Sequence, residues 1–222
     1  MVQSVELVYN QALSLAGSKG QVTSASETSR EAELCTVWYE TVRDNVMKAA
    51  PWASLRQDAR LVEAAERNWG ADWVSGDPAP QFTWAFTLPA NMLAPRFIHS
   101  GARFEIAPRS GILELMSNDE TPILRYTAND VAVADWDQGL FTTIVTMLAY
   151  QISFELTKKV SLTDRLLQRA YASVLMQRAQ EANEQQIQYR AIPEILTARG
   201  YDGFTSQLAY YYPYENLLGV AL

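Results

Sequence analysis

The stretch that decides the fold of this 222-residue chain is SETSREAELCTVWYETVRDNVMKAAPW, at Ser26–Trp52. Apolar side chains recur in it at three- and four-residue steps, so they share one face of a helix. The members of this stripe are Ala32, Cys35, Trp38, Tyr39, Val42, Val46 and Ala49. Thr28 and Glu31 match a capping box, and Pro51 forces Ala50 out of helical geometry. The sequence therefore predicts an amphipathic helix over Thr28–Ala50.

Composition and charge narrow the class of protein. Hydrophobic residues make up 48% and charged residues 19% of the chain, which is typical of a globular domain with its own core. Eighteen basic and 25 acidic residues give a net charge of −7. Binding of nucleic acid through phosphate neutralisation needs the opposite sign, so the charge argues against such binding and is still compatible with a position near DNA.

The single cysteine and the long apolar run point to core positions. Cys35 lies on the apolar stripe, where we expect a small buried side chain, and one cysteine permits no disulfide within the chain. The start of the chain has no basic segment and carries Glu6, which is unlike a signal peptide. Leu140–Leu156 falls short of about 20 apolar residues, so we expect a buried helix of a soluble domain.

Outside the long helix, helical and extended patterns alternate. A helix is expected at Val2–Leu15, ended by Gly17, with two more at Gln138–Lys159 and Thr163–Gln188. Between residues 53 and 136, Pro and Gly punctuate short extended runs, which predicts a small antiparallel sheet. The runs are Gln81–Leu88, Phe97–His99, Phe104–Ile106, Ile112–Met116 and Ile123–Thr127, and Arg56–Asn68 fits either a helix or a strand with a turn.

These patterns predict an α+β fold, mainly a bundle of long antiparallel helices with an inserted β-rich region. The predicted helical core comprises residues 1–52 and 137–189, and the insertion residues 53–136. Residues 190–222 are predicted to be an extended arm, rich in aromatic side chains. The arm either packs on its own subunit as a closing strand or docks on a partner. Its candidate partner-binding residues are Tyr210, Tyr211, Tyr212, Tyr214, Leu217 and Leu218.

No catalytic pattern emerges from the sequence. Gly17–Gly20 follows a helix and lacks the order of a phosphate-binding loop. One histidine, His99, and one cysteine cannot build a zinc site. The candidate metal ligands are Asp130, Asp135 and Asp137, and the candidate acid–base pairs come from Glu105, Glu114, Asp119 and Glu120. We expect Asp137 to cap a helix and the others to be exposed, which predicts no catalytic residue, no metal and no cofactor.

Several stretches, taken in order, resemble the tail tubular protein A family, the head-to-tail adaptor of short-tailed, podovirus-like bacteriophages. In the long helix they are Ser29–Leu34 and WYETVRD (Trp38–Asp44), closing at Pro51-Trp52. They continue with FTWAFTLP (Phe82–Pro89), Phe104–Ile106, Ile123–Asp130, and Asp137 followed by Phe141 and Leu148-Ala149. The chain departs from the family pattern at Ala53-Ser54, at Ala90-Asn91 and after Tyr189.

The resemblance implies a dodecameric homo-oligomeric ring in the tail of the virion, at the portal vertex, assembled in the host cytoplasm. Its implied partners are the portal protein, a nozzle protein similar to tail tubular protein B, and tail fibres. Genomic DNA would pass through the lumen during ejection without sequence-specific binding. Alternatives are a connector or stopper ring of a long-tailed phage, an assembly chaperone absent from the virion, and a metal-dependent hydrolase.

Overall fold

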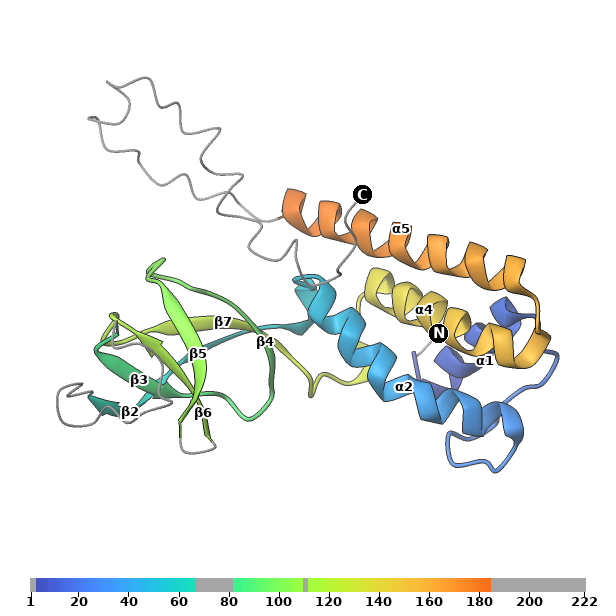
Figure 1. Ribbon diagram of the computed structural model, residues 1–222, viewed down its shortest axis with the longest axis horizontal. Coiled ribbons are helices and arrows are strands. Elements are labelled where there is room, and N and C mark those ends of the chain that lie inside the picture. The colour runs from blue at the N-terminus through green and yellow to red at the C-terminus, as the bar shows by residue number, and fades with distance from the viewer. Residues whose placement is uncertain (1–2, 67–81, 110–111, 185–222) are drawn as a thin grey trace, which may run out of the picture. The chain divides into compact units, whose positions relative to one another are not determined.

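The computed structural model describes residues 3–66, 82–109 and 112–184, and over these residues the chain is mixed α+β, as predicted. Helices α1 (Val5–Ala16) and α2 (Arg30–Ala49) precede the strands, and α4 (Gln138–Thr157) and α5 (Val160–Glu184) follow them (Figure 1). Two short 3-10 turns, η1 (Ala53–Leu55) and η2 (Val133–Asp135), flank the strand region.

The ends of the first two helices have local causes. Gly17, at φ 82°, ends α1 in the left-handed conformation that glycine adopts without strain. The predicted capping box at Thr28 and Glu31 is wrong, because the hydroxyl of Ser29 accepts from the N–H of Ala32 at 3.3 Å. With the cap at Ser29, the third helical position is Ala32, which has no polar side chain to accept from the N–H of Ser29. At the other end Ala50 is extended, at φ −141°, as its place before Pro51 predicts.

Helix α4 is the centre of the helical region. It packs against α1, α2 and α5, and it lies beside α5 along its length (Figure 1). By length and composition α4 is the one helix of the described residues that is apolar enough to span a membrane, yet more than half of it is buried within the protein. Its position in the core accounts for its composition, since its buried face includes Phe141, Ile144 and Leu148.

The described strands form two antiparallel sheets where the sequence predicted one. Their bounds are β1 (Arg56–Arg60), β2 (Val62–Glu66), β3 (Trp84–Thr87), β4 (Met92–Ile98), β5 (Phe104–Arg109), β6 (Ile112–Ser117) and β7 (Ile123–Ala128). Within the described residues one sheet has the order β1-β7-β4 and the other β2-β3-β6-β5. The ambiguous stretch from Arg56 is therefore two strands. The chain passes from the first sheet to the second at Leu61, whose N–H donates to the carbonyl of Pro122.

The two sheets share one apolar core. Phe86 faces Leu115 across β3 and β6, and Ile98 faces Leu124 across β4 and β7, and all four side chains belong to a single buried cluster. Burying each of these side chains stabilises the fold by about 1.5–3 kcal/mol. Pro95 and Pro108 lie in β4 and β5, which are edge strands of their sheets, so their missing N–H groups interrupt no inner ladder.

Candidate interaction surfaces

The predicted partner-binding residues, Tyr210, Tyr211, Tyr212, Tyr214, Leu217 and Leu218, lie outside the described residues. The same holds for the arm at residues 190–222 and for the last five residues of the predicted core. The docking prediction for this segment therefore stays a prediction, and the surfaces below are built from residues 3–66, 82–109 and 112–184.

The acidic candidates are dispersed. Asp137 caps α4, as expected: one carboxylate oxygen accepts from the N–H of Leu140 at 2.7 Å and the other from the hydroxyl of Ser54 at 2.6 Å. Asp130 accepts from the amide of Asn91, and Asp119 from the hydroxyl of Ser100. Among the described residues no group of three His, Cys, Asp or Glu side chains is placed to hold a metal ion.

Cys35 lies in the main core among α1, α2 and α4, as expected. Its side chain has no solvent exposure, and burial raises the pKa of its thiol to about 12. A thiol with this pKa is protonated and inert at neutral pH.

A polar cluster on the three-stranded sheet holds the only histidine. Asp58 in β1 accepts two hydrogen bonds of 2.8 Å from the guanidinium of Arg125 in β7, and the imidazole of His99 lies 3.1 Å from the same carboxylate. These bonds lower the pKa of Asp58 to about 2, with the Arg125 hydrogen bond as the largest cause. Arg125 also stacks 5.1 Å from the ring of Phe97. No sequence pattern predicted this cluster, because its members are distant along the chain.

Arg96 joins the sheet to the end of α2. In β4 the pairing passes from Pro95 to Phe97, so Arg96 is the extra residue of a β-bulge. Its Nη2 donates to the carbonyls of Met47 at 3.2 Å, Lys48 at 3.3 Å and Ala50 at 2.6 Å. Bulges redirect side chains, and this one aims a cation at carbonyls that the end of a helix leaves without partners.

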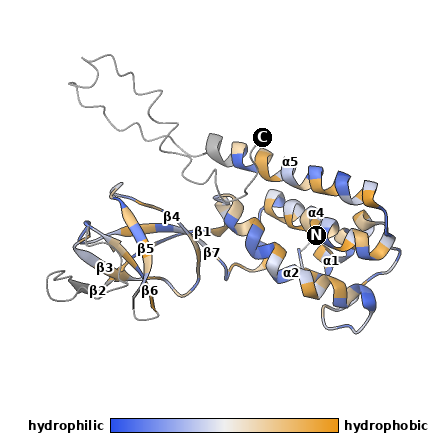
Figure 2. Ribbon diagram, viewed as in Figure 1, coloured by the Kyte–Doolittle hydropathy of each residue, from blue (hydrophilic) through white to orange (hydrophobic). Residues whose placement is uncertain are grey.

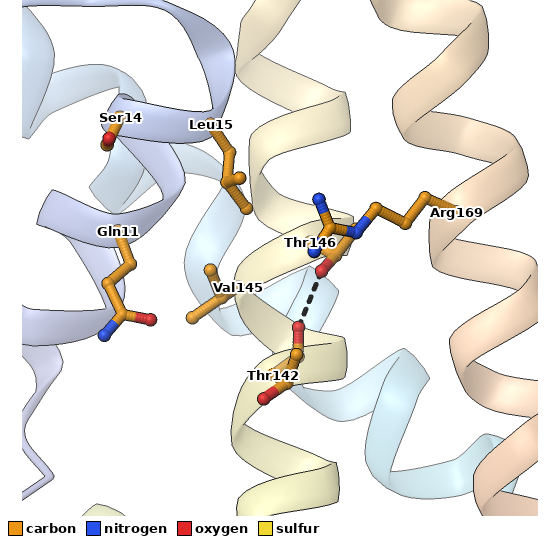
Figure 3. A pocket seen from close by; sticks show the side chains of 7 residues that line it. All are labelled: Gln11, Ser14, Leu15, Thr142, Val145, Thr146 and Arg169. Carbon is orange, nitrogen blue, oxygen red and sulfur yellow. Dashed lines mark hydrogen bonds between the residues drawn. The ribbon is translucent and has the colours of Figure 1, made fainter.

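A second surface is a hollow between α1 and α5, with α4 as its floor (Figure 3). Two adjoining spaces of about 250 and 570 Å³ share Leu15 and Arg169 in their walls, and Arg165 lines the larger one. Figure 3 shows the Arg169 side chain reaching from α5 across α4 toward Thr146. We call the surface formed by Leu15, Thr146, Arg165 and Arg169 the basic groove.

The basic groove holds unneutralised charge. Its lining includes two arginines and, among the described residues, no carboxylate. Within that part of the chain neither Arg165 nor Arg169 forms an ion pair, and both are exposed. In a protein of net charge −7 this is a local reversal of sign. Such a groove suits an acidic partner with some apolar surface.

The outer face of α2 has the complementary character. Glu33, Val37 and Glu40 recur at steps of four and three, so they form a line along the helix. Val37 is 70% exposed, and both glutamates are exposed, without an ion pair in the described residues. Hydrophilic and hydrophobic segments alternate along α2 and α5 (Figure 2). We call Glu33, Val37 and Glu40 the acidic stripe. Asp44 lies one turn further on but is paired with Arg43 at 2.8 Å.

No protein-family model matches this chain, and no protein of curated function matches it either.

Proposed function

We propose that this chain is a structural virion protein, a head-to-tail adaptor that connects the portal to the tail nozzle and forms part of the DNA ejection channel. One observation carries the proposal: the stretches that resemble the adaptor family fall in order on successive helices and strands. WYETVRD lies within α2, Pro51-Trp52 follows the end of that helix, and the aromatic stretch Phe82–Pro89 contains β3. The later stretches fall on β5, on β7 and on the start of α4.

The proposed architecture is a bundle of long antiparallel helices, from residues 1–52 and 137–189, with residues 53–136 as an insertion and residues 190–222 as an extended arm. Contacts at the two ends of the strand region support this division. Ser54, just after α2, donates to Asp137, which caps α4. The indole N–H of Trp52 donates to the carbonyl of Val46 at 2.8 Å, and that of Trp136 donates to Val131 at 3.2 Å. Because the two ends of the insertion are bonded together, its sequence can change without unfolding the helices on either side.

In the proposed assembly, copies of the chain form a ring, with twelve subunits as the resemblance implies. The ring lies between the portal and a nozzle protein similar to tail tubular protein B, and fibres attach nearby. The net charge of −7 supports a channel function, because acidic walls repel phosphates and let DNA slide, whereas basic walls would hold it. The protein would be found in the tail of the virion, and in the host cytoplasm during assembly. The proposal assigns the chain no enzymatic activity and no cofactor.

The contact with the portal is assigned to the C-terminal arm. Burying the four tyrosine side chains of this segment yields on the order of 6–10 kcal/mol, and ordering a dozen residues costs a similar amount. One arm therefore binds weakly, whereas a ring of tethered arms binds well through effective concentration. The residues concerned are Tyr210, Tyr211, Tyr212, Tyr214, Leu217 and Leu218.

Native mass spectrometry of the chain, alone and mixed with its candidate portal ring, tests the proposal. We expect a portal-bound ring with a fixed number of subunits. Deleting Ala209–Leu222 should leave the circular dichroism spectrum unchanged and abolish attachment to the portal. The matched control replaces Tyr201 and Phe204 by alanine, aromatic residues of the same segment outside the proposed contact.

Two outcomes contradict the proposal, and a third contradicts its assignment of the arm. A stable monomer or dimer that does not bind the portal would favour an enzyme or a chaperone. Absence of the chain from purified virions, measured by mass spectrometry, would favour a chaperone alone. Unfolding of the truncated chain would show that the arm belongs to the core of its own subunit.

A further inference from the structure

The two charged surfaces of the helical region lie on different helices that share one neighbour. α2 and α5 each pack extensively against α4, and the acidic stripe and the basic groove are exposed on α2 and beside α5. The stripe lies on the side of α2 opposite its buried residues Cys35, Tyr39 and Val42. The surfaces are therefore open to a second copy of the chain at the same time.

We propose that the basic groove of one copy receives the acidic stripe of the next copy, and that this contact links the subunits of the ring. The inference rests on the proposed ring and names the surfaces that build it. Glu33 and Glu40 meet the guanidinium groups of Arg165 and Arg169. Val37, exposed between the two glutamates, packs on Leu15 in the wall of the groove.

The charged residues of the two surfaces have similar spacings along their helix axes, so both pairs can meet. Arg165 and Arg169 are one turn apart, about 6 Å along the axis, and Glu33 and Glu40 are two turns apart, about 10.5 Å. Arginine side chains are long enough to splay across this difference. An amphipathic helix that lays a line of anchors into a groove is a common mode of recognition. Here the anchors follow the i, i+4, i+7 spacing of one helical face.

The contact is head to tail. Stripe and groove are different surfaces, and in the proposed ring each copy uses its stripe on one neighbour and its groove on the other. Such a contact repeats until it closes into a ring or runs on as a filament. This agrees with a ring adaptor, and a subunit count of two would overturn the ring in favour of a reciprocal dimer in which each stripe fills the other copy's groove.

Charge reversal tests the contact. The first variant carries Arg165→Glu and Arg169→Glu, and the second carries Glu33→Arg and Glu40→Arg. Each variant alone brings like charges together at every contact, and we expect self-association to weaken by at least about 100-fold. The readout is subunit number by native mass spectrometry and sedimentation, measured without and with the portal ring. The matched control Arg60→Glu reverses an exposed arginine of β1 and should assemble like the wild type.

Mixing the two variants gives the decisive result. In the mixture the reversed groove of the first variant meets the reversed stripe of the second, and the native groove of the second meets the native stripe of the first. Every contact between unlike variants is then attractive. We expect assembly to return, with the two variants in equal amounts. Recovery also shows that both variants are folded, because a misfolded chain cannot restore assembly.

The possible failures are distinguishable. If the wild type assembles and both variants assemble equally well, the groove is not the contact, and the adaptor proposal stands. If neither variant assembles alone and the mixture also stays unassembled, the pairing of stripe with groove is overturned. If the wild type stays monomeric both alone and with the portal, the ring and the adaptor proposal fail together.

Discussion

Replacement of Arg96 tests whether one side chain anchors the strand region to helix α2. Arg96→Met keeps the aliphatic stem and removes every hydrogen bond of the guanidinium. The strongest losses are the bond from Nε to the Thr127 hydroxyl at 2.7 Å and the bond from Nη2 to the Ala50 carbonyl at 2.6 Å. The bonds to Met47 and Lys48 are longer and share the two hydrogens of the same nitrogen.

The magnitude follows from these contacts. Hydrogen bonds of a charged group contribute about 1.5–3 kcal/mol each, and the loss of a cation at a helix C-terminus adds about 0.3–1 kcal/mol. Water recovers part of this at the carbonyl of Lys48, where the bond is exposed. We therefore expect Arg96→Met to lower the free energy of unfolding by about 2–4 kcal/mol. For a chain of this size that is a fall in Tm of about 5–12 °C.

The assay is urea unfolding followed by circular dichroism, with Arg96→Lys and Arg60→Met measured in parallel. Arg96→Lys keeps the charge and can satisfy one carbonyl, so it should lose about half as much. Arg60 is exposed in β1 and its replacement should stay within about 0.5 kcal/mol of the wild type. If Arg96→Met also stays within that range, the carbonyls at the end of α2 do not need this cation and the reasoning is refuted.

Three further predictions concern other parts of the molecule. Ser29→Ala should cost about 1 kcal/mol in urea unfolding because it removes the cap of α2, whereas Thr28→Ala should change little; equal costs would contradict the assigned cap. The pKa of Asp58 is lowered to about 2 from 3.8 by Arg125, so the carboxylate stabilises the fold above about pH 4 and loses this effect as the pH falls toward 2. Since the Asp58 side chain is more than a third exposed, we expect only about 1 kcal/mol between wild type and Asp58→Asn at pH 6. That difference should disappear near pH 2, and a constant difference would argue against ionisation as its cause. Cys35, buried and with its pKa raised to about 12, should ignore thiol reagents at pH 8 in the native protein and react fully in urea; rapid native labelling would contradict its burial.

Hydrophobic periodicity and the positions of proline, glycine and capping residues predicted the structural features that depend on neighbouring residues. The stripe through Cys35, Tyr39 and Val42 is buried, the helix ends before Pro51, and Asp137 caps α4. Each of these features is determined within about one or two helical turns, so the local sequence carries it. The five extended runs also became strands, with bounds that differ by a few residues.

Features that depend on distant residues were missed. Arg96 bonds to carbonyls 46–49 positions earlier, and no spacing rule connects a residue in a bulge with a helix end. The Asp58, His99 and Arg125 cluster arises only because β1 and β4 both pair with β7. The division of the strands into two sheets likewise follows from long-range pairing. The wrong prediction of a cap at Thr28 has a local cause. Thr28 and Ser29 are adjacent hydroxyl residues that both suit the N-cap position, and the sequence pattern does not choose between them.

In the proposed contact, like surfaces of two copies would repel, and that repulsion would select how the copies meet. Two acidic stripes face to face would place four carboxylates together, and two basic grooves would place four guanidinium groups together. Of these pairings only a stripe against a groove brings opposite charges together, so the arrangement disfavours dimers that join two stripes or two grooves. Closure then depends on the angle between α2 and α5, which is set by the way both helices pack on α4. The number of subunits in a ring would thus be determined by the core packing of the helical region, because the charges fix only which faces meet.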